Sequence, residues 1–300
     1  MTNNWAVQTR ALNKDYGRKR AVVDLNLEVP SGTIFALLGL NGAGKSTVLK
    51  MLVGLVRPNA GEGFCLGMDI HSRENEIRQK VGYLGAEPRI YGYMTVLQAI
   101  KFCRGFYREW DDGIVKHYLD VFQLAGATKL NQLSQGQKNQ LALLLALAPK
   151  PDLLLLDEPT SGFDPVKRRL FFNAVLKEML AEGKTVLLAS HQLEDMERVA
   201  DRVGLMHRGR LVHTCPLDEL RDREKEIRVV FQKEPPSELF NNPGIVELKK
   251  EGMAYRILIS DGLEEIWQSC AAFPHYALDV ISPDLEDIFL RYTGEGLQRD

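Results

Sequence analysis

Cysteine is scarce in this sequence, and neither sign of charge dominates it. The 300 residues include four cysteines, at positions 65, 103, 215 and 270, with no C-x-x-C pair and no zinc-type spacing to histidine. Reduced thiols in a cytoplasmic protein are the simplest account of these cysteines. Lys and Arg number 38 against 40 Asp and Glu, which gives a formal net charge of −2. No whole-chain field therefore attracts nucleic acid or anionic lipid.

Long hydrophobic runs are also missing. The longest are LALLLALA at 141–148 and LLLL at 153–156, and two prolines, a lysine and an aspartate separate them. A membrane-spanning helix needs about 18–20 apolar residues, so we expect a soluble chain without a span. Residues 1–17 lack the basic-then-apolar pattern of a secretory signal peptide, which again favours the cytoplasm.

Short apolar runs alternate with helical patterns along most of the chain. The strand-like runs are 33–38, 81–84, 153–156, 185–189 and 203–206. The helical patterns include 48–56, 96–107 and 167–183. Strands that alternate with helices predict a parallel sheet covered by helices, the architecture of an α/β protein. Residues 5–12 and 21–29 alternate apolar and polar side chains, which predicts an antiparallel pair with a turn at 17–19.

The composition changes near residue 221, at the charge run RDREKE (221–226), which is typical of a solvated linker or helix end. Beyond it, three strand patterns and two helical patterns predict a small α+β domain. The strand patterns are 227–232, 244–250 and 254–260, and the helical patterns are 263–273 and 282–294. We therefore expect two domains, 1–220 and 221–300.

The stretch GLNGAGKST at 39–47 fits the template G-x-x-x-x-G-K-[ST] at every fixed position. Its glycines let the backbone turn tightly and aim N–H groups at an anion. Lys45 would neutralise the β- and γ-phosphates, and the Ser46 hydroxyl would bind Mg²⁺. A strand before the loop and a helix after it favour a nucleotide site over a chance match. The predicted phosphate-binding residues are Gly39, Leu40, Asn41, Gly42, Ala43, Gly44, Lys45, Ser46 and Thr47.

Two carboxylates follow the apolar run at 153–156, at the strand end where ligands bind in open α/β sheets. Asp157 would hold Mg²⁺ through water, complementing Ser46. Glu158 is placed to orient or deprotonate the attacking water. The alternative is an acidic turn after a core strand, and the phosphate loop in the same chain makes that the weaker interpretation.

The segment LSQGQ at 133–137 places Ser134 three residues before Gln137, the spacing of a helix-capping box, and an apolar helix follows it. The free N–H groups of such a helix end suit a phosphate. An ordinary N-cap explains the same residues. The local sequence does not decide between the two interpretations.

Taken together, these motifs resemble the ATP-binding subunits of ABC transporters. GLNGAGKST, LSQGQ, LLLLDEPTSGFDP (153–165) and ASH (189–191) follow that family's order, and the resemblance covers about residues 5–220. It implies a P-loop NTPase core, mostly a parallel sheet with helices, with an antiparallel β subdomain and a helical subdomain at about 86–150. It identifies LSQGQ as the signature motif. Two ATP molecules would be clamped between two copies of the chain, each contacted by Ser134, Gly136 and Gln137 of the other copy.

The resemblance also implies roles for single residues. Glu158 is implied as the catalytic base and His191 as the switch histidine at the γ-phosphate. Asp164 would lie at the dimer seam, and Tyr16 would stack on adenine. The ordinary alternatives are a surface histidine and a tyrosine that packs at the end of the first strand.

Two positions depart from the family's pattern. The loop after VGYL (81–84) commonly carries a glutamine that touches the metal site and the permease, and Ala86 stands there, with Glu87 beside it. A methyl group binds no Mg²⁺, so Glu87 is a candidate substitute after a small backbone shift. Gln135 stands where the signature has glycine; it adds strain if the position requires a positive φ, and otherwise only a side chain.

The function that we expect is an ATPase that uses ATP and Mg²⁺, forms a homodimer and powers separate integral-membrane permease subunits from the cytoplasmic face of the cell membrane. No nucleic-acid partner is expected. SPDLEDIFLRYTG at 282–294 resembles the C-terminal segment of ATPases that serve ABC-2-type exporters, which favours export. Two alternatives are a soluble ABC-type ATPase that acts on a ribosome or DNA, and a regulatory nucleotide binder that hydrolyses weakly, which Ala86 prompts.

Overall fold

The computed structural model describes residues 4–88, 91–223, 225–282 and 285–293, without the side chains of 165, 174, 221–223, 287 and 290. Some of the expectations above concern residues 1–3, 224, 283–284 and 294, which lie outside the described residues. The side chains of the charge run at 221–223 are not described either. The chain forms two compact units, Met1–Thr214 and Cys215–Asp300. The expected domain boundary, after residue 220, falls within the second unit.

A six-stranded sheet, in the order β11-β10-β4-β9-β8-β7, forms the centre of the first unit. The strands are β4 (Ile34–Leu38), β7 (Val81–Leu84), β8 (Leu153–Asp157), β9 (Thr185–Ser190), β10 (Arg202–His207) and β11 (Arg210–Pro216). From β10 to β7 every neighbouring pair is parallel. Every residue of β4, β8 and β9 is buried, as expected for strands covered on both faces. The predicted parallel α/β sheet is confirmed.

A second sheet in this unit is antiparallel. Its strands are β1 (Trp5–Tyr16), β2 (Lys19–Leu25), β3 (Glu28–Pro30), β5 (Ala60–Cys65) and β6 (Met68–Asp69). β1 pairs with β2, β3 and β5. The β1–β2 turn contains Gly17, whose φ of 59° suits glycine. The predicted antiparallel pairing is confirmed, and β1 continues to Tyr16, four residues beyond the expected end at 12. The single strand expected at 21–29 is divided between β2 and β3.

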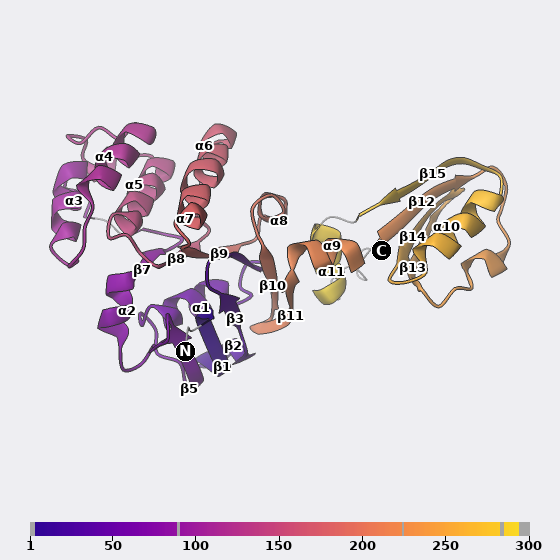
Figure 1. The fold of residues 1–300 in the computed structure, drawn as a ribbon, viewed down its shortest axis with the longest axis horizontal. Coiled ribbons are helices and arrows are strands. Elements are labelled where there is room, and N and C mark those ends of the chain that lie inside the picture. The colour runs from indigo at the N-terminus through magenta and orange to yellow at the C-terminus, as the bar shows by residue number, and fades with distance from the viewer. Residues whose placement is uncertain (1–3, 89–90, 224, 283–284, 294–300) are drawn as a thin grey trace. The chain divides into compact units, whose positions relative to one another are not determined.

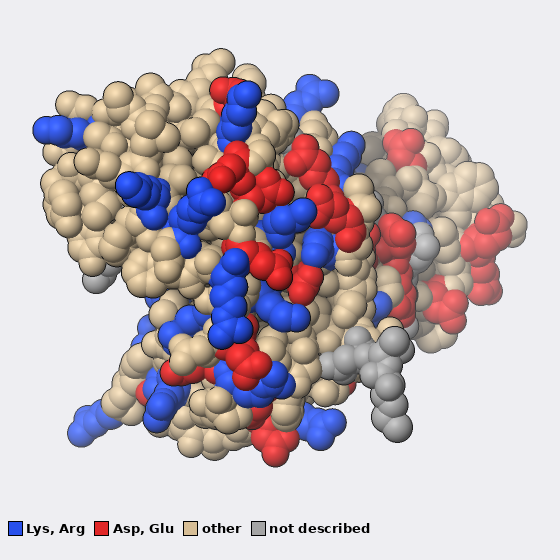
Figure 2. Space-filling model, turned by 60° about the vertical axis from the view of Figure 1, so that its left-hand side comes forward, with Lys and Arg blue, Asp and Glu red and all other residues tan. Residues whose placement is uncertain are grey.

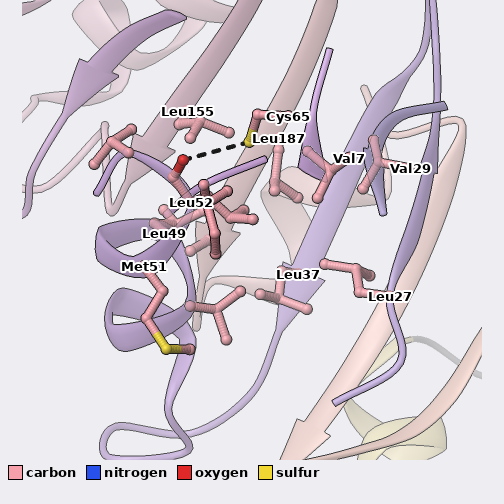
Figure 3. Packing of buried hydrophobic residues seen from close by; sticks show 14 of the residues in the cluster. Val7, Leu27, Val29, Leu37, Leu49, Met51, Leu52, Cys65, Leu155 and Leu187 are labelled. Carbon is pink, nitrogen blue, oxygen red and sulfur yellow. Dashed lines mark hydrogen bonds between the residues drawn. The ribbon is translucent and has the colours of Figure 1, made fainter. Parts of the chain in front are cut away.

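Helix α1 (Lys45–Leu52) packs against strands of both sheets. Figure 3 shows Leu49 and Leu52 of α1 among Leu155 and Leu187 of the parallel sheet, while Val7 and Val29 of the antiparallel sheet belong to the same core cluster. The Cys65 thiol donates to the Leu52 carbonyl at 3.4 Å. The helix predicted at 48–56 begins at Lys45 instead and ends at Leu52, because Gly54 has a φ of 68° and turns the chain.

The helical subdomain lies between β7 and β8 in the chain. Its helices are α3 (Val96–Arg104), α4 (Asp112–Val121), η1 (Leu130–Gln132) and α5 (Gln135–Leu147), and α2 (Glu74–Lys80) precedes β7. In Figure 1, α3, α4 and α5 lie together. Each has a side-chain N-cap, Thr95, Asp111 and Ser134 respectively. α3 ends at Arg104 rather than at 107.

The remaining helices of the first unit follow β8 and β9. They are α6 (Pro165–Leu170), η2 (Phe171–Leu176), α7 (Lys177–Ala181) and α8 (Leu193–Met196). A single helix was expected at 167–183, but η2 is a π-helical segment that interrupts it. A π-helix has a wider turn than an α-helix, and this one buries a broad face. The buried residues are Phe171, Phe172, Val175 and Leu176.

The second unit is built on an antiparallel sheet in the order β13-β14-β12-β15. Its elements are α9 (Leu217–Arg223), β12 (Lys225–Phe231), η3 (Ser237–Phe240), β13 (Ile245–Glu251), β14 (Ala254–Ile259), α10 (Leu263–Ala272), β15 (His275–Ile281) and α11 (Leu285–Thr293). β15 was not predicted, because this edge strand has no fully buried residue and hence no clear apolar alternation. Ile266 and Cys270 of α10 join the sheet's core cluster. The expected α+β composition is confirmed.

Within the part of the chain that the structure describes, no helix combines the length and the hydropathy that crossing a bilayer would require.

Candidate functional site

The loop from Gly39 to Gly44 joins β4 to α1. Gly42 and Gly44 have φ values of 86° and 108°, which side-chain-bearing residues rarely adopt. A Cβ on Gly44 would lie 2.3 Å from the Ala21 carbonyl oxygen, so this position accepts only glycine. The loop forms one wall of a cavity of about 310 Å³. The cavity is lined by Tyr16, Lys19, Ala21, Asn41, Gly42, Ala43, Gly44, Lys45, Ser46, Thr47, Ala86 and Glu158.

The first residue of α1 carries the central cation of this cavity. Lys45 Nζ donates to the carbonyl of Gly39 at 2.6 Å and to that of Leu40 at 3.3 Å, and it lies 3.7 Å from Glu158 Oε1. Burial lowers the pKa of Lys45, while the charges of Glu158 and Asp157 oppose that shift. Gly39 and Leu40 thus position the lysine and lie outside the cavity wall. A phosphate in the cavity would meet a cation that the loop already holds.

Ser46 and Asp157 meet where α1 begins and β8 ends. The Ser46 hydroxyl donates to Asp157 Oδ1 at 2.9 Å. Asp157 is 1% exposed, and its Oδ2 is buried without a hydrogen-bond partner among the described residues. Burial raises the pKa of this carboxyl. A buried orphan carboxylate oxygen beside a hydroxyl is a donor set that fits Mg²⁺, which favours oxygen ligands.

These two residues would not form a complete metal cage. Among the described residues, no group of three or more His, Cys, Asp or Glu side chains is placed to hold a metal ion. Mg²⁺ at nucleotide sites normally keeps several waters and binds one or two protein groups together with substrate phosphates. The site therefore fits a metal that arrives with a nucleotide.

Glu158 is held in an unusual backbone conformation. Its φ is +48°, in the left-handed region that costs side-chain-bearing residues energy, and its N–H donates to the Ala189 carbonyl at 2.9 Å. Glu158 Oε1 lies 2.8 Å from His191 Nδ1, and Oε2 accepts from Ser190 Oγ at 3.3 Å. Backbone strain of this kind collects at functional sites. Sequence patterns had indicated Glu158 and His191, but not the contribution of Ser190.

The N-terminus of α5 has the predicted capping box. Ser134 Oγ accepts from the Gln137 N–H at 3.2 Å, and Gln137 Oε1 accepts from the Ser134 N–H at 3.0 Å. Gln135 lies in the first turn of α5 without a positive φ, and its Nε2 donates to Asn139 Oδ1 at 3.1 Å. Glutamine therefore adds a side chain at this position and no backbone strain. Ser134, Gly136 and Gln137 are absent from the wall of the phosphate-loop cavity of their own chain.

The start of α5 is fastened to the segment that follows Glu158. A Cβ on the buried Gly136 would lie 2.7 Å from the Gly162 carbonyl oxygen. The buried Asn139 donates from Nδ2 to the Ser161 carbonyl at 2.7 Å. Asn139 was not identified from the sequence. Its only signal there was a polar residue within a helix that is buried. The signature segment is thus linked directly to the chain next to the carboxylates.

Asp164 is the N-cap of α6. Its Oδ1 accepts from the Lys167 N–H at 2.9 Å, and this bond lowers the pKa of the exposed carboxyl. The predicted place of Asp164 at a dimer seam stays a prediction. The contacts of the single chain account for it as a helix cap.

Tyr16, at the end of β1, lines the phosphate-loop cavity and is 49% exposed. Lys14 Nζ lies 5.2 Å from the centroid of its ring. An accessible ring beside the phosphate loop is the geometry that base stacking requires.

Ala86 lies where three cavities meet. It lines the phosphate-loop cavity and two larger ones of about 720 and 770 Å³. Glu87 is exposed and lines only the two larger cavities. The 720 Å³ cavity extends from Ser46 and Asp157 to the aromatic rings of the helical subdomain. Those rings are Tyr91, Phe102 and Tyr107.

Figure 2 shows Lys and Arg side chains interspersed with Asp and Glu over the middle of the face that it presents. This view contains no broad field of one sign, in keeping with the formal net charge of −2.

The fold and the site define a P-loop nucleotide-binding cassette. A family model described as ABC transporter matches residues 22–161. The Nod factor export ATP-binding protein I of Rhizobium johnstonii is 31% identical over 98% of this chain and 96% of its own length. The chain belongs to the family of ABC transporter ATP-binding proteins.

Two further comparisons agree with this assignment. The probable multidrug ABC transporter ATP-binding protein of Escherichia coli is 37% identical over 221 residues, which are 72% of this chain and 38% of that protein. The chain thus matches well under half of the length of that relative. A solved structure of an ATP-binding subunit of an ABC transporter superposes with a TM-score of 0.67 at 26% identity, over 72% of this chain and 92% of the other.

Proposed function

We propose that this chain is the ATP-hydrolysing subunit of an exporter, that it works as a homodimer, and that it drives separate permease subunits in the membrane. One observation carries the proposal: a buried lysine, a serine and a strained glutamate line one cavity of about 310 Å³, and the serine bonds a buried carboxylate. The residues that line the cavity are Lys45, Ser46 and Glu158, and Asp157 accepts from the Ser46 hydroxyl. Two relatives, a Nod factor export ATP-binding protein and a probable multidrug ABC transporter ATP-binding protein, favour export by their names.

The phosphates of ATP would lie along the N–H groups of 41–47, at the N-terminus of α1. Lys45 is already oriented by loop carbonyls, so little reorganisation is needed when phosphate binds. Ser46 and Asp157 would hold Mg²⁺, which neutralises charge on the phosphates when it is bound. The exposed ring of Tyr16 would stack on adenine.

Glu158 would act as the general base. Water attacks the γ-phosphorus, its proton passes to the carboxylate, and the bond between the γ-phosphorus and the bridging oxygen of ADP breaks. His191 and Ser190 restrict the carboxylate to one orientation through contacts of 2.8 and 3.3 Å. Positioning of this kind supplies much of the rate gain in phosphoryl transfer.

A second copy of the chain would complete the site. Ser134 is exposed at the N-terminus of α5 and belongs to no wall of its own phosphate-loop cavity. Its free helix end would therefore serve ATP that is bound to the partner copy. Hydrolysis removes the γ-phosphate that joins the two halves, so the dimer would open after each turnover.

The permease would dock on the aromatic side of the helical subdomain. Tyr91, Tyr93 and Phe106 are 57, 71 and 63% exposed, which is unusual for rings that lie close together. Tyr91 also packs edge-on against Phe102, which lines the cavity leading to Asp157. A permease segment at this surface would place the protein on the cytoplasmic face of the membrane and couple it to the metal site.

The decisive test is ATP turnover by the purified chain beside a Glu158→Gln variant. We expect turnover in the original chain and a loss of at least about 100-fold in the variant, with ATP binding retained. The variant should also accumulate as an ATP-bound dimer in size-exclusion chromatography. Equal, slow turnover in both proteins would favour the regulatory nucleotide binder instead.

Affinity purification of the tagged chain from detergent-solubilised membranes tests the transporter assignment. Recovery of an integral-membrane permease would support it. Recovery of ribosomes or DNA in place of a permease would overturn it.

A further inference from the structure

Tyr83 presents a buried hydroxyl to the same cavity as the predicted metal site. It lies on β7, where it pairs in register with Leu155 of the parallel neighbour β8. Side chains two residues apart on a strand share a face, so Tyr83 lies on the face that carries Asp157. Tyr83, Ser46 and Asp157 all line the 720 Å³ cavity.

Both polar groups on this face are incompletely satisfied. The Tyr83 hydroxyl is buried without a hydrogen-bond partner among the described residues, and so is Asp157 Oδ2. Buried groups of this kind normally find partners, because a buried polar group without a hydrogen bond destabilises the folded state. Because both residues line one cavity, a group bound in that cavity is available as a partner for both atoms.

The residues next to the Tyr83 hydroxyl are small and leave space beside it. A Cβ on Gly85 would lie 3.1 Å from the Tyr83 oxygen, and the next residue, Ala86, offers only a methyl group to the cavity. Burial, with a further contribution from the charge of Asp157, raises the pKa of Tyr83 to about 12. The phenol is therefore protonated at neutral pH and available as a donor.

We propose that the Tyr83 hydroxyl positions a water in the coordination sphere of the nucleotide-bound metal, beside Asp157, in place of the glutamine side chain that Ala86 lacks. Tyr83 is a positioning residue here, since it acts through the water and not on the phosphate. This inference rests on the proposed function and adds a member to its site. It also explains how this chain can retain Ser46 and Asp157 at the metal site although the loop that leads to the helical subdomain carries alanine.

The test uses Tyr83→Phe, which removes one oxygen and keeps the ring that packs against the core. The probe is Mn²⁺, titrated by electron paramagnetic resonance into the purified chain with a non-hydrolysable ATP analogue. We expect Mn²⁺ to bind about 10-fold more weakly to the variant, the lower end of the usual effect of outer-shell partners. Binding of the analogue in EDTA should be unchanged.

Three further measurements separate this role from a structural one. Tyr107→Phe removes the hydroxyl of another tyrosine that lines the same cavity, from the helical subdomain, and should leave Mn²⁺ affinity unchanged. The thermal midpoint of metal-free Tyr83→Phe should equal or exceed that of the original chain, because an unsatisfied buried hydroxyl has been removed. In the double variant Tyr83→Phe with Ala86→Gln, the new amide should restore at least part of the Mn²⁺ affinity.

The possible results are distinguishable. Equal Mn²⁺ affinity in Tyr83→Phe and Tyr107→Phe would overturn the role of Tyr83 while leaving ATP binding and turnover intact. A lowered thermal midpoint with unchanged Mn²⁺ affinity would overturn it too, by showing that the hydroxyl stabilises the fold and not the metal site. A chain that binds no nucleotide, with or without Mn²⁺, would overturn the proposed function and this inference together.

Discussion

His191 Nδ1 lies 2.8 Å from Glu158 Oε1, although 33 positions separate the two residues in the sequence. The contact arises because β8 and β9 are parallel neighbours and each residue immediately follows its strand. Both side chains thus emerge at the carboxyl edge of the sheet, where open α/β folds bind ligands. The histidine leaves the carboxylate few orientations.

His191→Ala should lower ATP turnover by about 100-fold, the lower end of what general-base catalysis contributes, because Glu158 loses the contact that orients it. ATP affinity should change much less, because Lys45 and the loop amides that hold the phosphates stay in place. Steady-state turnover and equilibrium binding of a fluorescent ATP analogue measure the two effects separately. Equal losses in both would show that His191 acts mainly in binding.

Gly136→Ala should damage the link between α5 and the segment after Glu158. The new Cβ would lie 2.7 Å from the Gly162 carbonyl oxygen, and a backbone atom has little freedom to move aside. We expect a loss of about 1–3 kcal/mol in the free energy of unfolding, as in other overpacked sites, together with reduced ATP turnover. Chemical denaturation monitored by circular dichroism gives the energy.

Gly105→Ala is the matched control. Gly105 has a φ of −64°, and its added Cβ would lie 3.4 Å from the Phe102 carbonyl oxygen, an ordinary contact. This variant should be as stable as the original chain or slightly more so. A comparable loss in both variants would refute the steric argument.

Tyr118→Phe should weaken the attachment of α4 to α7. The buried Tyr118 hydroxyl donates to Glu178 Oε2 at 2.6 Å, a short bond to a carboxylate. Bonds to charged groups contribute about 1.5–3 kcal/mol, and partial exposure of Glu178 places the expected loss of stability near the lower value. Urea denaturation of Tyr118→Phe, Glu178→Gln and the double variant gives the coupling energy, and additive effects would rule the bond out as a stabilising contact.

Cys103 should be the first thiol to react in the folded chain. Cys65, Cys215 and Cys270 are 0, 5 and 0% exposed, whereas Cys103 is half-buried beside the 720 Å³ cavity. Burial also raises the pKa of Cys103, so little of it is thiolate at pH 8, and its alkylation should accelerate as the pH rises above the usual thiol value. Peptide mass spectrometry after timed alkylation identifies the modified residue. Faster labelling of Cys65, whose pKa burial raises to about 12, would contradict this expectation.

Local patterns in the chain predicted the backbone geometry of the phosphate loop and of the N-terminus of α5. Three features depend only on residues within a few positions of each other: glycines with positive φ, a lysine at a helix start and a serine–glutamine capping pair. Gly42, Gly44 and Ser134 could therefore be predicted from the sequence. The apolar runs of β4, β8 and β9 are equally clear, because strands buried on both faces tolerate little else. Edge strand β15 lacks that constraint and was missed.

By itself, then, the sequence determined the phosphate loop, the two carboxylates and the alternation of strands and helices, since these follow from short-range stereochemistry and from burial. Tertiary structure alone decided which distant groups meet. In the folded chain Glu158 adopts a positive φ and contacts His191. Gly136 packs closely against the Gly162 carbonyl, and Tyr83 lies on the sheet face that carries Asp157. Those relations depend on the order and register of the strands, which no local pattern encodes.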